Sequence, residues 1–250
     1  MRASTSDCAE PPRLSAYLVV SLHLGPGAVF FGFLYVLSGV FVRHGLTGYL
    51  AELIAIPACL APMLIGIVFL WSRRAGEGRS LIRAITYRER GAAVDYIVWP
   101  FLLYAAWALS SLVTVPLAQA LETQVAGWFP PQLSTRALMS GVVGSPAAQR
   151  HATFVLAIVF SGVLAPVVEE AYFRGFLLPR MRHWSWLAPV ASSFLFGLYH
   201  FISPWSLPVI FVAFLPVVFV VQATKNFRIG IVVHAMFNIT GVLNVFLQRG

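Results

Sequence analysis

Seven stretches of this sequence are apolar over the length that a helix needs to cross a membrane. A helix takes about 20 residues to span the hydrocarbon core of a bilayer. The stretches cover about residues 16–42, 49–71, 92–118, 152–178, 185–203, 206–222 and 229–247. Their apolar runs are continuous, whereas the strands of a membrane barrel alternate apolar and polar residues. The sequence therefore predicts an all-α, polytopic transmembrane helical bundle of about seven spans, within a range of six to eight.

The composition excludes a soluble domain and leaves the bilayer as the main surroundings of the chain. Hydrophobic residues make up 59% of the sequence and charged residues only 10%, whereas soluble domains are about a quarter charged. The net charge of +8 does not indicate nucleic acid, because basic residues of membrane proteins collect in loops beside anionic lipid. We expect an integral, multi-pass protein of the bacterial inner (cell) membrane, with no nucleic-acid partner.

The arginines between the second and third spans predict the orientation. Segment 72–91 carries six arginines against Glu77 and Glu89, so it is expected to be cytoplasmic. Seven crossings then put the N-terminus inside and the C-terminus outside. We expect one transmembrane domain over residues 1–250, with accessory helices and a loop in 1–149 and a catalytic core in 150–245. Residues 119–150 are of mixed polarity and are interpreted as a loop that holds at most an amphipathic helix.

Two adjacent glutamates interrupt the fourth apolar span. Glu169 and Glu170 are the only acidic residues from position 123 to the end. A carboxylate near the bilayer centre costs roughly 2.5–3.5 kcal/mol on insertion scales, so a pair without a purpose is not expected there. Glu170 and Arg174 are four residues apart and can form an ion pair on one helix face. Glu169 lies about 100° away from that face. The alternative is that both glutamates pair with Arg174 and only lock the helix.

Further polar residues lie in two later spans. His200 closes the run FLFGLYH, and His234 and Asn238 share one face of the last span. A single intramembrane histidine is often only a packing residue, but residues of this kind face the bundle interior, where they can converge. A buried glutamate can take a proton from water, a histidine can share that proton, and a His–Asn pair can donate to an oxyanion. The pattern predicts a hydrolytic site between the C-terminal helices. The HExxH zinc signature is absent.

Three motifs in this order resemble a known family. Residues 169–174 match EExxxR, residues 196–200 match FxxxH, and residues 234–238 match HxxxN. Over roughly residues 150–245 the chain is similar to the CPBP family of glutamic intramembrane endopeptidases, which includes the type II CAAX prenyl endopeptidases and bacterial Abi-type proteins.

The resemblance implies a role for each matching residue. Glu169 would activate water with the help of His200, and His234 and Asn238 would stabilise the oxyanion. Glu170 and Arg174 would support the site, and Phe196 would pack beside it. No cofactor is expected. The alternative is a zinc ion held by Glu169, His200 and His234, whose side chains are of the types that bind zinc.

The sequence thus predicts an intramembrane endopeptidase that cuts a peptide bond near the cytoplasmic face of the membrane. Its expected partners are the lipid bilayer and a membrane-anchored peptide or protein, prenylated or not, as in CAAX-type processing or a bacterial equivalent. Two alternatives stay open. One is a proton-coupled transporter with Glu169, His200 and His234 as a relay, although no duplicated halves are visible. The other is a non-catalytic membrane immunity or scaffold protein.

Overall fold

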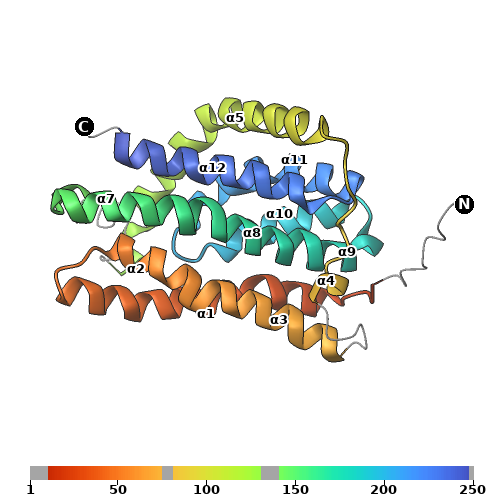
Figure 1. Ribbon diagram of the computed structural model, residues 1–250, viewed down its shortest axis with the longest axis horizontal. Coiled ribbons are helices and arrows are strands. Elements are labelled where there is room, and N and C mark those ends of the chain that lie inside the picture. Colours follow the sequence, from red (N-terminus) through yellow and green to blue (C-terminus); the bar gives the residue numbers. More distant parts are fainter. Residues whose placement is uncertain (1–10, 75–80, 131–140, 248–250) are drawn as a thin grey trace, which may run out of the picture.

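The computed structural model describes residues 11–74, 81–130 and 141–247, and within them the protein is an all-α bundle, as predicted (Figure 1). The bounds of its elements are α1 Ala16–Arg43, α2 Gly48–Ala55, η1 Ile56–Leu60, α3 Ala61–Arg74, α4 Leu81–Ala84, α5 Asp95–Val125, η2 Ala126–Trp128, α7 Ala147–Leu156, η4 Ala157–Leu164, α8 Ala165–Glu170, η5 Ala171–Leu177, α9 Leu178–Arg180, η6 Arg182–Trp184, α10 Leu187–Tyr199, η7 Pro204–Ser206, α11 Leu207–Thr224 and α12 Phe227–Leu247.

Six continuous helical segments in the described ranges are long and apolar enough to cross a membrane, so the chain is an integral membrane protein. They are Ala16–Arg43, Gly48–Arg74, Asp95–Val125, Ala147–Arg180, Pro204–Thr224 and Phe227–Leu247. The remaining predicted span, 185–203, holds a shorter apolar helix, α10, which ends at Tyr199. At 1.5 Å per residue, its 13 residues cover only about 20 Å, less than the roughly 30 Å of a hydrocarbon core.

The prediction that residues 119–150 form a loop is wrong at both ends of this stretch. Helix α5 continues to Val125 and is followed by η2, while α7 already begins at Ala147. The sequence-based limits missed these turns because polar residues such as Thr123 and Arg150 lower the local hydropathy, although they stand at helix ends, where polar side chains reach water. Residues 131–140 of this stretch lie outside the described part of the chain.

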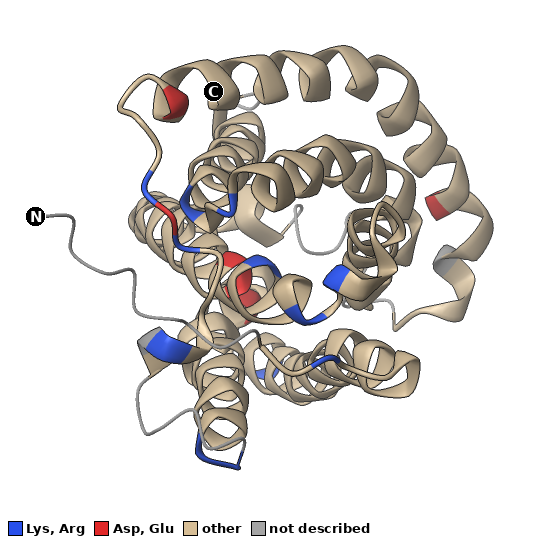
Figure 2. Cartoon of the chain, turned by 90° about the vertical axis from the view of Figure 1, so that its right-hand side faces the viewer, with Lys and Arg blue, Asp and Glu red and all other residues tan. Residues whose placement is uncertain are grey.

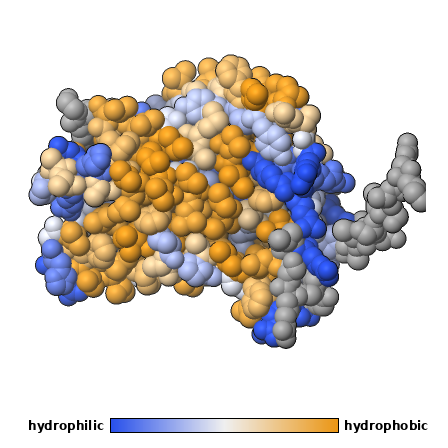
Figure 3. Space-filling model, viewed as in Figure 1, coloured by the Kyte–Doolittle hydropathy of each residue, from blue (hydrophilic) through white to orange (hydrophobic). Residues whose placement is uncertain are grey.

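Basic residues gather at one end of the bundle. Figure 3 shows hydrophilic side chains at this end and an apolar surface across the middle, and Figure 2 views the end directly. The segment between α4 and α5 crosses this end and is bound on both sides. Thr86 N donates to Gly175 O (3.0 Å), and Glu89 N donates to Lys225 O (2.9 Å). This segment therefore ties the end of the fourth span to the turn between α11 and α12.

The sequence Gly25-Pro26-Gly27 neither starts α1 nor breaks it. Helix α1 runs through Pro26 from Ala16 to Arg43. The reason for a glycine here is close packing, because a Cβ at Gly27 would overlap the backbone oxygen of Tyr199. Gly27 therefore lets α1 approach the C-terminal end of α10, which is where the candidate site lies.

Two π-helical segments flank the short α8 that carries both glutamates. They are η4 and η5, and wider π turns of this kind occur frequently at functional sites. In η4, Ala165 N donates five residues back to Phe160 O. The next acceptor in this register is the carbonyl of Ser161, and its donor would be residue 166. That residue is Pro166, which has no N–H, so the Ser161 carbonyl is free to accept from elsewhere.

Candidate active site

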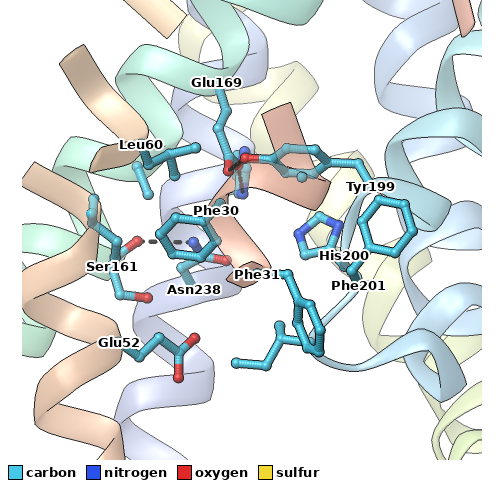
Figure 4. Close-up of a pocket in the computed structure, with 15 residues that line it drawn as sticks. Phe30, Phe31, Glu52, Leu60, Ser161, Glu169, Tyr199, His200, Phe201 and Asn238 are labelled. Atoms are coloured by element: carbon cyan, nitrogen blue, oxygen red, sulfur yellow. Dashed lines mark hydrogen bonds and ion pairs between the residues drawn. The ribbon is translucent and has the colours of Figure 1, made fainter. Parts of the chain in front are cut away.

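A cavity of about 200 Å³ lies inside the bundle and collects side chains from both halves of the chain (Figure 4). Helix α1 and the α2–η1 segment form one wall, and η4, α8, α12 and the turn after α10 form the other. Its lining residues are Gly27, Phe30, Phe31, Glu52, Ile56, Leu60, Ser161, Ala165, Glu169, Tyr199, His200, Phe201, Ile202, His234 and Asn238. The C-terminal helices supply the predicted site, and the first half closes it.

Glu169 projects from α8, and each of its carboxylate oxygens faces a polar side chain of another helix. The hydroxyl of Tyr199 donates to Oε1 (3.0 Å), and Nε2 of His234 lies 3.7 Å from Oε2. Glu169 is only 5% exposed, so few waters reach it besides those that enter the cavity. A carboxylate held at the edge of a small cavity is in position to act on a single bound water.

Glu170 faces away from the cavity and forms the ion pair that the spacing predicts. Its Oε1 lies 3.1 Å from NH1 of Arg174 and also 3.1 Å from Nδ1 of His234. Glu170 and Arg174 are fully buried. Gly230 provides the room, because a Cβ there would overlap Oε2 of Glu170. Glu170 therefore fixes the orientation of His234 from the side away from the cavity. Residue spacing within one helix could not predict this contact between two helices.

Aromatic rings enclose the Arg174 guanidinium. Its Cζ lies 4.0 Å from the ring centre of Phe196, 4.9 Å from Phe214 and 5.7 Å from Phe173. Cation–π attraction is strengthened when the cation is desolvated, so these rings offset part of the cost of burying the charge. The Phe196 ring also makes edge contacts with His200 and His234, at centroid distances of 4.9 and 5.9 Å. Phe196 thus packs between the arginine and the two histidines.

His200 lies just beyond the end of α10, where the helix has ended inside the bundle. Its Nδ1 is 2.8 Å from the carbonyl oxygen of Phe196. Because a carbonyl oxygen only accepts, Nδ1 carries a proton in this contact, and Nε2 of the neutral ring is left as an acceptor. Because α10 ends at Tyr199, His200 lies in the turn that follows the helix, and it lines the same cavity as Glu169.

Asn238 is anchored by the carbonyl that Pro166 leaves free. Its Nδ2 donates to Ser161 O (2.8 Å). An amide nitrogen carries two protons, so the second N–H can donate to a group in the cavity. Asn238 and His234 both line the cavity, as their spacing of four residues predicts.

The structure brings together Glu169, His200, His234 and Asn238 around one cavity, while Glu170, Arg174 and Phe196 pack behind them. Their assigned roles stay predictions. Tyr199 and Glu52 are cavity residues that the sequence analysis did not predict. Tyr199 had a signal, because it is a polar residue directly before His200 in an apolar run. Glu52 had a weaker one, because it lies only three residues after the expected start of its span, at residue 49.

The zinc alternative stays a prediction. Among the described residues, no group of three or more His, Cys, Asp or Glu side chains is placed to hold a metal ion. The contacts of the predicted ligands leave further atoms available: Nδ1 of His200 donates to a backbone carbonyl, as it does in many zinc-binding histidines, and only Oε1 of Glu169 accepts from Tyr199.

Comparison with known proteins gives one match. Residues 151–240 match the family described as Type II CAAX prenyl endopeptidase Rce1-like. The matched segment begins in α7 and ends in α12, and it contains all seven residues of the three motifs. No curated protein and no solved structure matches the chain.

Proposed function

Since residues 151–240 match the family described as Type II CAAX prenyl endopeptidase Rce1-like, we propose that the chain is an intramembrane endopeptidase that hydrolyses a peptide bond of a membrane-anchored substrate. The observation that supports this most is the shared cavity of Glu169, His200, His234 and Asn238. These residues come from three separate apolar segments, and only the fold brings them together. The bacterial cell membrane is the location that we expect.

The first step is the activation of water. A water molecule in the cavity would lie against Glu169, whose carboxylate takes one of its protons while the oxygen attacks the carbonyl carbon of the substrate. Tyr199 donates to one carboxylate oxygen and His234 lies beside the other, so Glu169 does not have to reorganise when the proton moves. Nε2 of His200 accepts a hydrogen bond from the same water. General base catalysis by a positioned carboxylate contributes about 10²–10⁴-fold to a rate.

The second step is the collapse of the tetrahedral intermediate. Its oxyanion would accept a hydrogen bond from the free N–H of Asn238, with His234 on the same helix face. The carbon–nitrogen bond then breaks, and the amine leaves with the proton that Glu169 took from water. One preorganised donor of this kind is worth about 10²–10³-fold in kcat. Every group in this scheme belongs to the chain, and no metal is part of the proposal.

Replacing Glu169 by glutamine tests the proposal. We would incubate the purified chain with a panel of prenylated and unprenylated membrane-anchored peptides, with and without chelator. The wild type should cleave at least one peptide, and Glu169→Gln should lower kcat by about 10²-fold or more. Glu122→Gln is the matched control, because Glu122 lies on α5 and does not line the cavity.

Three outcomes would contradict parts of the proposal. Cleavage by Glu169→Gln at the rate of the wild type would contradict the glutamate mechanism. Loss of wild-type cleavage with chelator would support the metal alternative. No cleavage of any peptide, together with proton flux in liposomes, would favour the transporter. The panel also identifies the substrate, including whether a prenyl group is needed.

A further inference from the structure

A second carboxylate faces the cavity at the opposite side from Glu169. Glu52 projects from α2, and Figure 4 shows it separated from Glu169 by the side chains of Ser161 and Asn238. Its chain neighbours Ala51 and Leu53 are fully buried, whereas Glu52 itself is half-buried against the cavity. The scheme for peptide hydrolysis given above has no task for this residue.

Glu52 has no internal partner among the residues that the structure describes. Glu169 and Glu170 both contact His234, and Glu170 also pairs with Arg174, but within residues 11–74, 81–130 and 141–247 no hydrogen bond or ion pair involves the Glu52 carboxylate. Carboxylates that are withdrawn from water are ordinarily paired. A helix that places one against a cavity beside fully buried neighbours therefore leaves a position for a ligand group.

The lining of the cavity indicates the charge of that group. Among the residues that the structure describes, it contains two carboxylates, Glu52 and Glu169, and no lysine or arginine. Arg174 is enclosed by aromatic rings behind the wall and does not line the cavity. The rings of Phe30, Phe31 and Phe201 also line the cavity, and ring faces attract cations. The lining thus favours a cation and disfavours an anion such as a free C-terminal carboxylate.

We propose that Glu52 is a specificity-determining residue that binds a lysine or arginine side chain of the peptide substrate, on one side of the bond that is cut at Glu169. This rests on the proposed function and extends it by naming the substrate class: peptides with a basic residue close to the cleavage site. In this proposal Glu52 contributes to substrate binding and thereby to the choice of peptide, and it takes no part in breaking the bond.

Paired peptides test this proposal. Each pair is identical except that one position near the cleavage site holds lysine or its uncharged analogue norleucine. At one position, wild type should prefer lysine in kcat/KM by about tenfold, which corresponds to about 1.4 kcal/mol of binding. Glu52→Gln should lose this preference, and the loss should appear as a higher KM for the lysine peptide. Glu52→Arg should prefer glutamate at the same position.

Two controls distinguish a failure of this proposal from a failure of the proposed peptidase function. Glu122→Gln removes a carboxylate outside the cavity and should leave the lysine preference unchanged. Binding is also measured without cleavage, by titrating fluorescent peptides into Glu169→Gln and into Glu169→Gln with Glu52→Gln. A lysine preference in binding that needs Glu52 supports this proposal even if no peptide is cut, in which case only the peptidase function fails. An equal lysine preference with and without Glu52, or none at any position, overturns it.

Discussion

At the scale of single residues, Tyr199 shows how the site holds its catalytic carboxylate. The hydroxyl donates to Glu169 in a buried setting, and the tyrosine ring packs against Phe173, 5.0 Å away between ring centres. The donor is therefore fixed by packing before a substrate arrives. A hydrogen bond to a charged group is worth about 1.5–3 kcal/mol, which is enough to affect the rate measurably.

Tyr199→Phe should therefore lower kcat by roughly 10–100-fold, because Glu169 loses a donor that positions it. KM should change little, since the substrate keeps its own contacts. Tyr172→Phe is the matched control: it also removes a buried tyrosine hydroxyl, which donates to Leu22 O at 2.8 Å, but Tyr172 does not line the cavity. Steady-state kinetics of both variants, with thermal unfolding as a check of integrity, would decide. Equal effects would show that Tyr199 only stabilises the fold.

Not all of the site could be predicted at this scale. Glu169, His200, His234 and Asn238 were visible in the sequence because polar residues in apolar spans are costly and stand out. Tyr199 and Glu52 gave weaker signals and were missed, since tyrosine is common in membrane helices and Glu52 lies close to a helix end. The contact between Glu170 and His234 joins residues 64 positions apart, and no local spacing rule reaches that far.

At the scale of elements, the approach of α1 to α10 decides whether the cavity closes. Gly27 lies against the backbone of Tyr199, and the α1 residues Phe30 and Phe31 line the cavity nearby. Hydropathy predicted α1 well, yet it could not predict which helix α1 would contact. The same holds for α10, whose run of apolar residues in the sequence is longer than the helix itself.

Gly27→Ala should therefore push α1 away from the end of α10 and lower stability by about 1–3 kcal/mol, the usual cost of overpacking. Activity should fall as well, because Tyr199 carries the contact to Glu169. Gly32→Ala in the same helix is the control, since a Cβ there meets open space. Thermal unfolding in detergent and peptide cleavage would be compared for the two variants. Equal behaviour of both would show that α1 and α10 are not closely packed.

At the scale of the whole molecule, the cavity extends away from the basic end. Glu169 lies 11 residues before Arg180, or roughly 16 Å along the helix axis. Glu52 lies 21 residues before Arg73, or roughly 32 Å, close to the full thickness of a hydrocarbon core. The sequence predicts cleavage near the cytoplasmic face, and this stays a prediction; by these lengths, the cavity extends from about the middle of the bundle towards the end opposite the basic residues.

A cysteine at position 52 should therefore be labelled from the side opposite the basic loops. In a variant without Cys8 and Cys59, Glu52→Cys would be exposed to a membrane-impermeant maleimide in intact cells and in inverted vesicles. We expect labelling in cells. Arg83→Cys on α4, at the basic end, is the control and should be labelled only in inverted vesicles. The reverse pattern would show that the orientation taken from the arginines is wrong.

The short helix α10 also constrains how the chain is made. Its 13 residues end inside the bundle, so the turn that carries His200 can be kept from lipid only by neighbours, and α1 is one of them. Helix α1 leaves the ribosome long before α10 and has to remain available until the α10–α11 hairpin enters the membrane. If the chain were expressed without residues 1–146, the α10–α11 hairpin would be open to quality-control proteases. The half-life in the cell of the segment that matches the family therefore depends on the preceding part of the chain, which the family match does not cover.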